Sequence, residues 1–317
     1  MHCLETNEFP YYPTDDVWRR EEFSKFIQYQ GNLWDNKIIK QTMHGLALSW
    51  SYMPHAFDVQ CGNMNTPLQS FHNDKEKIKK KMVQLGHVDS PSGLRKVLKV
   101  ITGSQGVSNF RPTAAQAIYE KFLPNGGTTW DMSGGYGGRL LGAIKTHINY
   151  IATEPAKETF DGLNQIANDW GQQSNLFGIE QRLEIIQSGS EDYVPKVDSL
   201  DLCFTSPPYF DTEKYSNEET QSYKKFPKKV DWLEGFLRRT IKNCWFGLKL
   251  NKYLIINIAN VSSFETLEEE TANIVLSEGF EYIDTLKLSL SKMPGKNLQV
   301  DKFKYEPIFI FRKKRKR

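Results

Sequence analysis

The sequence Leu-Asp-Leu-Cys-Phe-Thr-Ser-Pro-Pro-Tyr occupies residues 200–209. Its largely apolar first half predicts a buried strand, and Pro207 and Pro208 end that strand because proline has no N–H group for a sheet ladder. Proline also fixes φ, so the backbone after Ser206 is stiff and its carbonyl groups stay unpaired. A hydroxyl group, a free carbonyl group and the Tyr209 ring are therefore expected together at the end of one strand.

These groups suit a conjugated amino group as ligand, because the oxygen atoms can accept its hydrogens while the aromatic ring stacks on the ring that carries it. The alternative is an ordinary strand-to-loop turn in which Tyr209 only covers the strand end, since short motifs also match by chance. Residues 205–209 alone leave both interpretations open.

From Pro112 onward, strand and helix signals alternate. Strands are predicted over 129–132, 150–153, 183–187, 200–205, 253–258, 282–288 and 307–311, and helices over 113–122, 139–145, 156–170, 230–248 and 264–277. This alternation is typical of an α/β fold whose mostly parallel sheet carries helices on both faces. Ligands of such sheets bind at the carboxyl ends of the strands.

Residues 1–107 have a different texture. Helices are predicted over 20–30, 36–49, 66–85 and 93–101. The Gly/Ser-rich stretch 102–106 is the best candidate for a boundary. We therefore predict two parts, a helical N-terminal region over 1–107 and a second domain over 108–317.

Composition favours a globular protein with a sizeable core, since 39% of the 317 residues are hydrophobic and 25% are charged. No apolar run is long enough to span a membrane and the chain start does not resemble a signal peptide, so we expect a cytoplasmic location. The four cysteines, Cys3, Cys61, Cys203 and Cys244, are far apart, which predicts free thiols and no zinc site.

The formal net charge of +3 says little about a polyanionic partner, but the cations are clustered. Lysines and arginines gather in 75–81, 224–229 and 312–317. Such clusters can neutralise phosphate groups, or they can simply form solvated surface, which is the interpretation favoured for 75–81.

Residues 131–138, Asp-Met-Ser-Gly-Gly-Tyr-Gly-Gly, lie between a predicted strand and a predicted helix. Glycines permit a tight turn and close approach of a ligand, and the helix start offers free N–H groups. Glu154 ends the next strand, where a carboxylate can accept both hydroxyls of a ribose. Taken singly, these are a tight turn and a solvated acid, but their joint spacing predicts a cofactor that contains a nucleoside. Ser190, after the third strand, fits either a contact to an adenine edge or a helix N-cap.

At this point the chain resembles the S-adenosylmethionine-dependent DNA amino-methyltransferases. The resemblance covers about residues 108–312 and implies a Rossmann-like methyltransferase fold with a seven-stranded sheet. Asp131, Gly135 and Gly137 match the firmest positions of the family's methionine-binding turn, although Met132-Ser133 replaces the usual Pro-Phe. The cofactor-binding residues that it implies are Arg111, Asp131, Ser133, Gly135, Gly137, Glu154 and Ser190, and the catalytic residues are Ser206, Pro207, Pro208 and Tyr209.

The resemblance implies transfer of a methyl group from S-adenosylmethionine to the exocyclic amino group of a DNA base that is flipped out of the duplex. Serine at position 206 is similar to the cytosine-N4 branch of the family, and no Pro-Cys pair supports methylation of cytosine C5. The alternatives are adenine N6, then an RNA base or a protein amide, and then a non-catalytic protein with this fold that only binds nucleic acid.

DNA is thus the expected partner, in a prokaryotic or phage-encoded methyltransferase. The N-terminal region, loop 210–229 and segment 289–305, with Lys292, Lys296, Asn297, Lys302 and Lys304, are the candidates for DNA recognition. The N-terminal region could instead mediate a homodimer, and a paired restriction endonuclease is a further partner that the resemblance leaves open.

Overall fold

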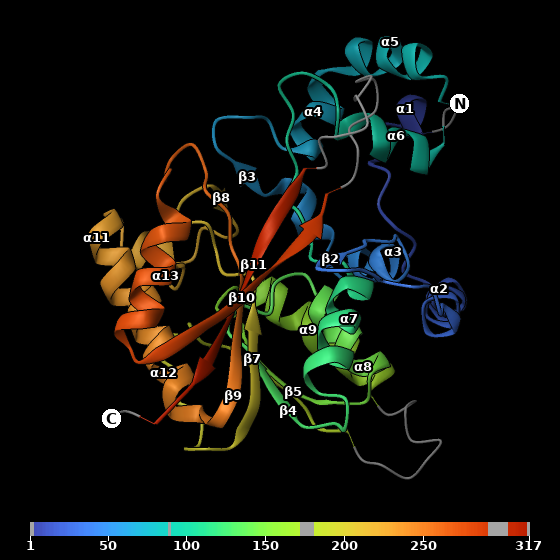
Figure 1. Ribbon diagram of the computed structural model, residues 1–317. Coiled ribbons are helices and arrows are strands. Elements are labelled where there is room, and N and C mark those ends of the chain that lie inside the picture. Colours follow the sequence, from blue (N-terminus) through green and yellow to red (C-terminus); the bar gives the residue numbers. More distant parts are fainter. Residues whose placement is uncertain (1–2, 88–89, 172–180, 291–303, 316–317) are drawn as a thin grey trace.

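The computed structural model describes residues 3–87, 90–171, 181–290 and 304–315 (Figure 1). One large sheet runs through the molecule. Its strands are β1 (Trp34–Asp35), β2 (Ile38–Ile39), β4 (Thr128–Asp131), β5 (Asn149–Thr153), β6 (Leu183–Ile186), β7 (Leu200–Thr205), β9 (Leu248–Asn257), β10 (Phe280–Ser289) and β11 (Tyr305–Lys313). They are arranged in the order β1-β2-β10-β11-β9-β7-β4-β5-β6.

The five adjacent strands β6, β5, β4, β7 and β9 run parallel to one another, and β11 is antiparallel to both β9 and β10. The predicted α/β class with a mostly parallel, Rossmann-like sheet is therefore confirmed. From β4 the chain builds outward through β5 and β6, then returns to β7 on the other side of β4. Strand order thus reverses between β4 and β7, and doubly wound sheets bind ligands at such a reversal.

Helices cover both faces of the sheet, as predicted (Figure 1). One face packs against α3 (Leu46–Ser51), α7 (Pro112–Phe122), α8 (Gly138–Lys145) and α9 (Lys157–Trp170). The other packs against α11 (Lys229–Trp232), the π-helical η3 (Leu233–Arg238), α12 (Arg239–Gly247) and α13 (Leu267–Ser277). Successive strand residues point to opposite faces, so Phe204 enters the first core and Cys203 the second.

The helix predicted over 36–49 is wrong in its first part. Residues 34–39 form a hairpin of β1 and β2, in which Trp34 pairs with Ile39 and Asp35 with Ile38. Asn36 takes a left-handed φ of 52° in the two-residue turn, a conformation that asparagine tolerates better than most residues. Strand β2 then pairs with β10, which extends the predicted seven strands to nine.

The remaining N-terminal residues are mainly helical. They form α1 (Cys3–Thr6), α2 (Asp16–Gln28), the 3₁₀ helix η1 (Pro54–Asp58), α4 (Pro67–Asn73), α5 (Lys75–Leu85) and α6 (Pro91–Leu98). Helices α4 to α6 share a small core of their own, around Phe71, Ile78 and Leu94. The division of the chain at residue 107 stays a prediction.

The loop after β7 contacts this N-terminal region directly. Its short strand β8 (Glu213–Lys214) pairs with β3 (Gln60–Cys61), and the Gly62 N–H donates to the Thr212 carbonyl at 3.1 Å. A single helical turn, α10 (Ser222–Lys225), follows in the same loop. The loop that begins at the Pro-Pro turn is therefore held against residues far away in the sequence.

Within the described residues, no helix combines the length and apolar character needed to cross a bilayer. Cys61, Cys203 and Cys244 are buried free thiols, as expected. The same part of the chain contains no group of His, Cys, Asp and Glu side chains arranged to hold a metal ion.

Candidate functional site

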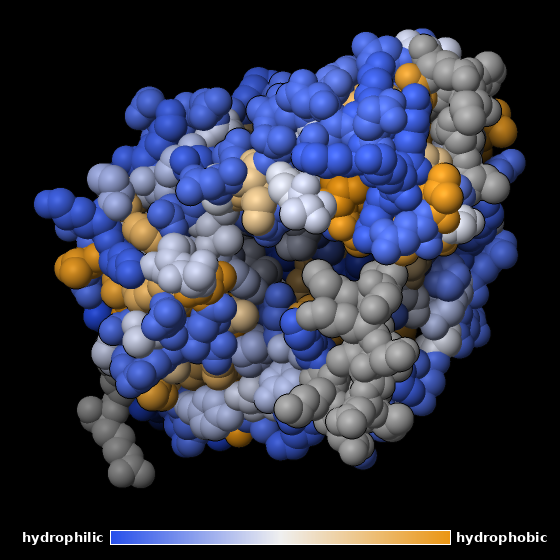
Figure 2. All heavy atoms as spheres, turned by 90° about the horizontal axis from the view of Figure 1, so that it is seen from above, coloured by the Kyte–Doolittle hydropathy of each residue, from blue (hydrophilic) through white to orange (hydrophobic). Residues whose placement is uncertain are grey.

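A cavity of about 660 Å³ opens where β4 and β7 end, at the reversal of strand order. Ser133 and Gly135 of the glycine-rich turn line it, as do Glu154 and the Ser206–Tyr209 turn. Seen from above, this side of the molecule is mostly hydrophilic and hollowed near its centre (Figure 2). The fold therefore brings the two predicted motifs, which are far apart in the sequence, to one cavity.

Asp131 was predicted to bind the cofactor, but its carboxylate lies behind the cavity wall and is fully buried. One oxygen accepts hydrogen bonds from Arg139 Nε at 2.7 Å and the Tyr150 hydroxyl at 2.6 Å. The other accepts from the Ser133 N–H at 3.2 Å and the Thr205 hydroxyl at 2.9 Å. Asp131 thus ties the end of β4 to the glycine-rich turn, α8, β5 and the end of β7.

Two further glycines of the turn occupy positions where a larger residue would be strained or would clash. Gly137 caps α8 in the left-handed conformation, with φ of 82°, and does not line the cavity. At Gly138 a Cβ atom would lie 1.7 Å from the Phe110 carbonyl oxygen, so no larger residue fits. Gly135, with φ of 56°, is the predicted glycine that faces the cavity.

Glu154 lies at the end of β5, where the sequence predicted it. Its carboxylate oxygens accept hydrogen bonds from the Gly135 and Ala156 N–H groups, each at 3.0 Å. Burial disfavours the charged form and raises its pKa from the usual 4.5 to about 7, although the two N–H groups act in the opposite direction. Glu154 therefore stabilises the glycine-rich turn through the Gly135 N–H, and it also lines the cavity.

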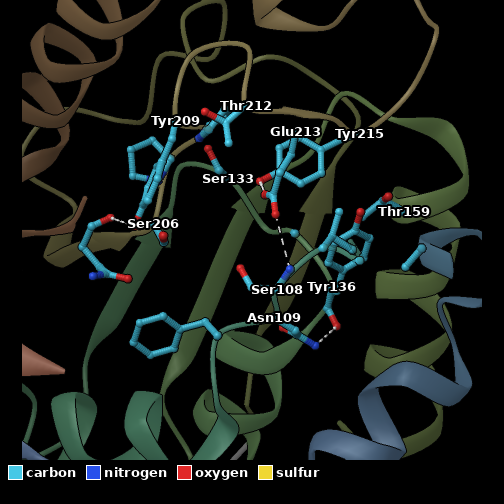
Figure 3. A pocket seen from close by; sticks show the side chains of 18 of the residues that line it. Ser108, Asn109, Ser133, Tyr136, Thr159, Ser206, Tyr209, Thr212, Glu213 and Tyr215 are labelled. Carbon is cyan, nitrogen blue, oxygen red and sulfur yellow. Dashed lines mark hydrogen bonds between the residues drawn. The ribbon is translucent and has the colours of Figure 1, made fainter. Parts of the chain in front are cut away.

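The Ser206–Tyr209 turn lies across the cavity from Tyr136 and Tyr215 (Figure 3). The Tyr209 hydroxyl contacts the Asn257 carbonyl at 3.5 Å, and Ser206 and Glu306 lie near it. Burial raises the pKa of Glu306. These contacts fix the position of the Tyr209 ring within the cavity.

The other two predicted cofactor residues also line the cavity. Arg111 precedes α7 and donates from Nε to the Gln41 side chain at 3.1 Å. Ser190 is buried, and its hydroxyl is 2.8 Å from that of Thr240. Its backbone carbonyl accepts from Asn243 Nδ2 at 3.1 Å, so Ser190 is held by α12.

Several lining residues were not predicted. Asn257 ends β9 beside β7, and a polar residue after Leu254-Ile255-Ile256 is a strand-end signal that could have revealed it. Glu213 and Tyr215 follow the Pro-Pro turn within the loop predicted for recognition. The lining residues Trp50, Phe57, Arg95 and Lys99 carry no local signal, because the N-terminal region reaches the cavity only through tertiary packing.

The predicted basic clusters are partly neutralised within the protein. Lys225 pairs with Glu191 and with Asp192, the latter at 2.6 Å. Near the chain end, Arg312 and Lys314 both pair with Glu281. Of the candidate recognition segment, Lys292, Lys296, Asn297 and Lys302 lie outside the described residues.

No family model matches the sequence, and no curated protein matches it. Solved structures with a similar fold include an S-adenosylmethionine-dependent methyltransferase from Methanosarcina mazei, at 12% identity and a TM-score of 0.43, which aligns over 62% of this chain and 97% of its own. A methyltransferase from Pyrococcus furiosus has 16% identity and a TM-score of 0.44, over 76% and 98% of the two chains.

The raised pKa of Glu154 predicts a pH dependence of stability. Between about pH 4.5 and about pH 7 the folded protein keeps a proton on Glu154 that the unfolded chain has lost, so stability falls as pH rises. We expect the free energy of unfolding of the wild type, relative to Glu154→Gln, to fall by up to about 3 kcal/mol over this range. Urea unfolding at several pH values measures it, and a constant difference between the two proteins would contradict the environment described for Glu154.

Proposed function

We propose that this protein transfers a methyl group from S-adenosylmethionine to the exocyclic amino group of a base in DNA, with cytosine N4 as the target. The observation that carries this proposal is the shared cavity. The glycine-rich turn after β4 and the Ser-Pro-Pro-Tyr turn after β7 line it together, at the point in the sheet where strand order reverses.

The residues present fit S-adenosylmethionine. A cavity of about 660 Å³ is of the size that holds a cofactor together with part of a substrate. Gly135 offers close approach at the turn, and Glu154 offers carboxylate lone pairs to ribose hydroxyls. The resemblance implies that the segment with Arg111, which precedes β4, covers the methionine end, and Ser190, after the third predicted strand, would face the adenine end.

The catalytic work falls to the turn after β7. The amino nitrogen of a nucleobase is a poor nucleophile because its lone pair is conjugated with the ring. Hydrogen bonds from this amino group to the Ser206 hydroxyl oxygen and the Pro207 carbonyl would favour a tetrahedral nitrogen and localise the lone pair. When bound, S-adenosylmethionine supplies a methyl group on a positively charged sulfur, and the surplus proton of the methylated nitrogen passes to water.

Tyr209 would hold the base by stacking. The cavity lies where strands β4 and β7 of the protein sheet end. A base inside a DNA duplex cannot reach it, so the base must be flipped out of the duplex. The contact of the Tyr209 hydroxyl with the Asn257 carbonyl, with Glu306 nearby, keeps the aromatic ring beside the accepting oxygens. The turn is thus arranged to fix both the plane of the base and its amino group.

The proposal predicts a defined product. With labelled S-adenosylmethionine and mixed-sequence duplex DNA, digestion to nucleosides should yield labelled N4-methylcytosine. Parallel reactions with RNA and with protein test the substrate class. Label in N6-methyladenine would show that the target is adenine N6 and not cytosine N4. The absence of label from both nucleosides would contradict methylation of DNA amino groups.

The proposed roles predict a split between transfer and cofactor binding. Ser206→Ala and Tyr209→Ala should each lower kcat by at least about 100-fold, because positioned hydrogen bonds and stacking act on the base, while the Kd for S-adenosylmethionine changes little. Single-turnover assays and calorimetry measure the two quantities.

Two controls accompany these variants. Tyr209→Phe keeps the stacking ring but loses the hydroxyl contacts that position it, so its activity should lie between those of Tyr209→Ala and the wild type. Ser199→Ala changes a serine just before β7 that does not line the cavity, and it should behave as the wild type. Loss of cofactor binding in Ser206→Ala or Tyr209→Ala would contradict the assignment of this turn to the base.

A further inference from the structure

Three cations line the cavity at the side of the N-terminal region: Arg95 on α6, Lys99 just after it, and Arg111 before α7. Within the described ranges none of them forms an ion pair with a carboxylate, in contrast to Lys225, Arg312 and Lys314. The cavity therefore contains a group of positive charges without a protein counter-charge.

These charges act on one another. Part of the Lys99 side chain is exposed to solvent, but protein atoms surround its ammonium group. Desolvation is the main reason why the pKa of Lys99 is lowered, and repulsion from Arg111 and Arg95 lowers it further. Desolvation also lowers the pKa of Arg111. An anion among the three groups would relieve this repulsion and restore the interactions lost on desolvation.

Two of the cations are held in place. Arg95 donates to the Pro10 carbonyl at 2.8 Å and to the Tyr11 carbonyl at 3.1 Å, and its guanidinium lies 3.9 Å from the centre of the Tyr12 ring. Arg111 is held by Gln41. The Lys99 ammonium has no hydrogen bond to any described residue, so its donors are available to a ligand.

A row of aromatic rings connects this group to the glycine-rich turn along the cavity. Tyr136 of the turn lies 5.2 Å from Trp50, which lies 6.0 Å from Phe57. Phe57 stacks on Tyr12 at 6.2 Å, and Arg95 covers Tyr12. Aromatic rings beside cations are the usual wall of a groove that holds single-stranded nucleic acid, with stacking for bases and charge for the backbone.

We propose that Arg95 and Lys99 form a phosphate site, which binds a backbone phosphate of the DNA strand whose base enters the cavity, while Arg111 beside them stays at the methionine end of the cofactor. The inference rests on the proposed function, since a flipped nucleotide carries its flanking phosphates with it. Arg95 and Lys99 come from the N-terminal region, at the far end of the aromatic row from the glycine-rich turn. The site thus gives the N-terminal region a role in positioning the strand rather than in reading its sequence.

The other anion that could occupy this site is the carboxylate of the cofactor's methionine part. The two sources are separated by measuring DNA and cofactor binding on the same variants. Lys99→Met removes the charge and Lys99→Arg keeps it. Lys96→Met is the matched control, because Lys96 is an exposed lysine of the same helix that does not line the cavity.

Fluorescence anisotropy with a labelled mixed-sequence oligonucleotide, single-stranded and duplex, gives DNA affinity over a range of salt concentrations. Calorimetry with S-adenosylhomocysteine, which has the same carboxylate, gives cofactor-site affinity and verifies folding. We expect Lys99→Met to weaken DNA binding about 5- to 10-fold at 0.1 M salt and to reduce the slope of log K against log salt by about one. Lys99→Arg and Lys96→Met should match the wild type, and all four proteins should bind S-adenosylhomocysteine equally.

Two results would overturn the phosphate site while leaving the proposed function intact. One is equal DNA binding by Lys99→Met and Lys96→Met in a wild type that methylates DNA. The other is loss of S-adenosylhomocysteine affinity in Lys99→Met with unchanged DNA binding, which would assign the site to the cofactor carboxylate. A wild type that neither binds nor methylates DNA would overturn both proposals together.

Discussion

The buried carboxylate of Asp131 is the constraint on which the site depends. Four donors from α8, β5, the glycine-rich turn and the end of β7 satisfy its two oxygens, so the charge is compensated without water. Removing one partner of a buried ion pair typically costs about 3–5 kcal/mol, which makes this arrangement hard to relax. Because Thr205 immediately precedes Ser206, the contact from Thr205 to Asp131 also sets where the Pro-Pro turn begins relative to the glycine-rich turn.

In the proposed function the two turns need this common anchor, because methyl transfer would depend mainly on how the reacting groups are positioned. A sulfonium methyl group is already reactive, so the protein's task is to hold a weak nucleophile in line with it. Strands β4 and β7 are neighbours and end at the same edge of the sheet, which brings the glycine-rich turn and the Ser-Pro-Pro-Tyr turn to one cavity. The N-terminal region lines one side of that cavity with a row of aromatic rings that leads to Arg95, and it contacts the loop after β7 through the pairing of β3 with β8.

The sequence was informative where chemistry and periodicity coincide. Three local signals were placed in the structure as expected: the alternation of strands and helices after Pro112, the two prolines that end the strand at Thr205, and the position of Glu154 at the end of a strand. Asp131 and Gly137 were also expected at the cofactor, and the structure places them behind the residues that line the cavity, where they shape the glycine-rich turn. The hairpin at 34–39 and the cavity-lining Lys99 were missed since both depend on partners far away in the chain.

A crystal structure with S-adenosylhomocysteine bound tests the central claim most directly. We expect its ribose hydroxyls on Glu154 and its sulfur atom between the Gly135 turn and Ser206, with open space beside Tyr209 for a base. A sulfur atom that points away from Ser206, or a ligand bound outside this cavity, would contradict the proposal that the two turns form one methyl-transfer site.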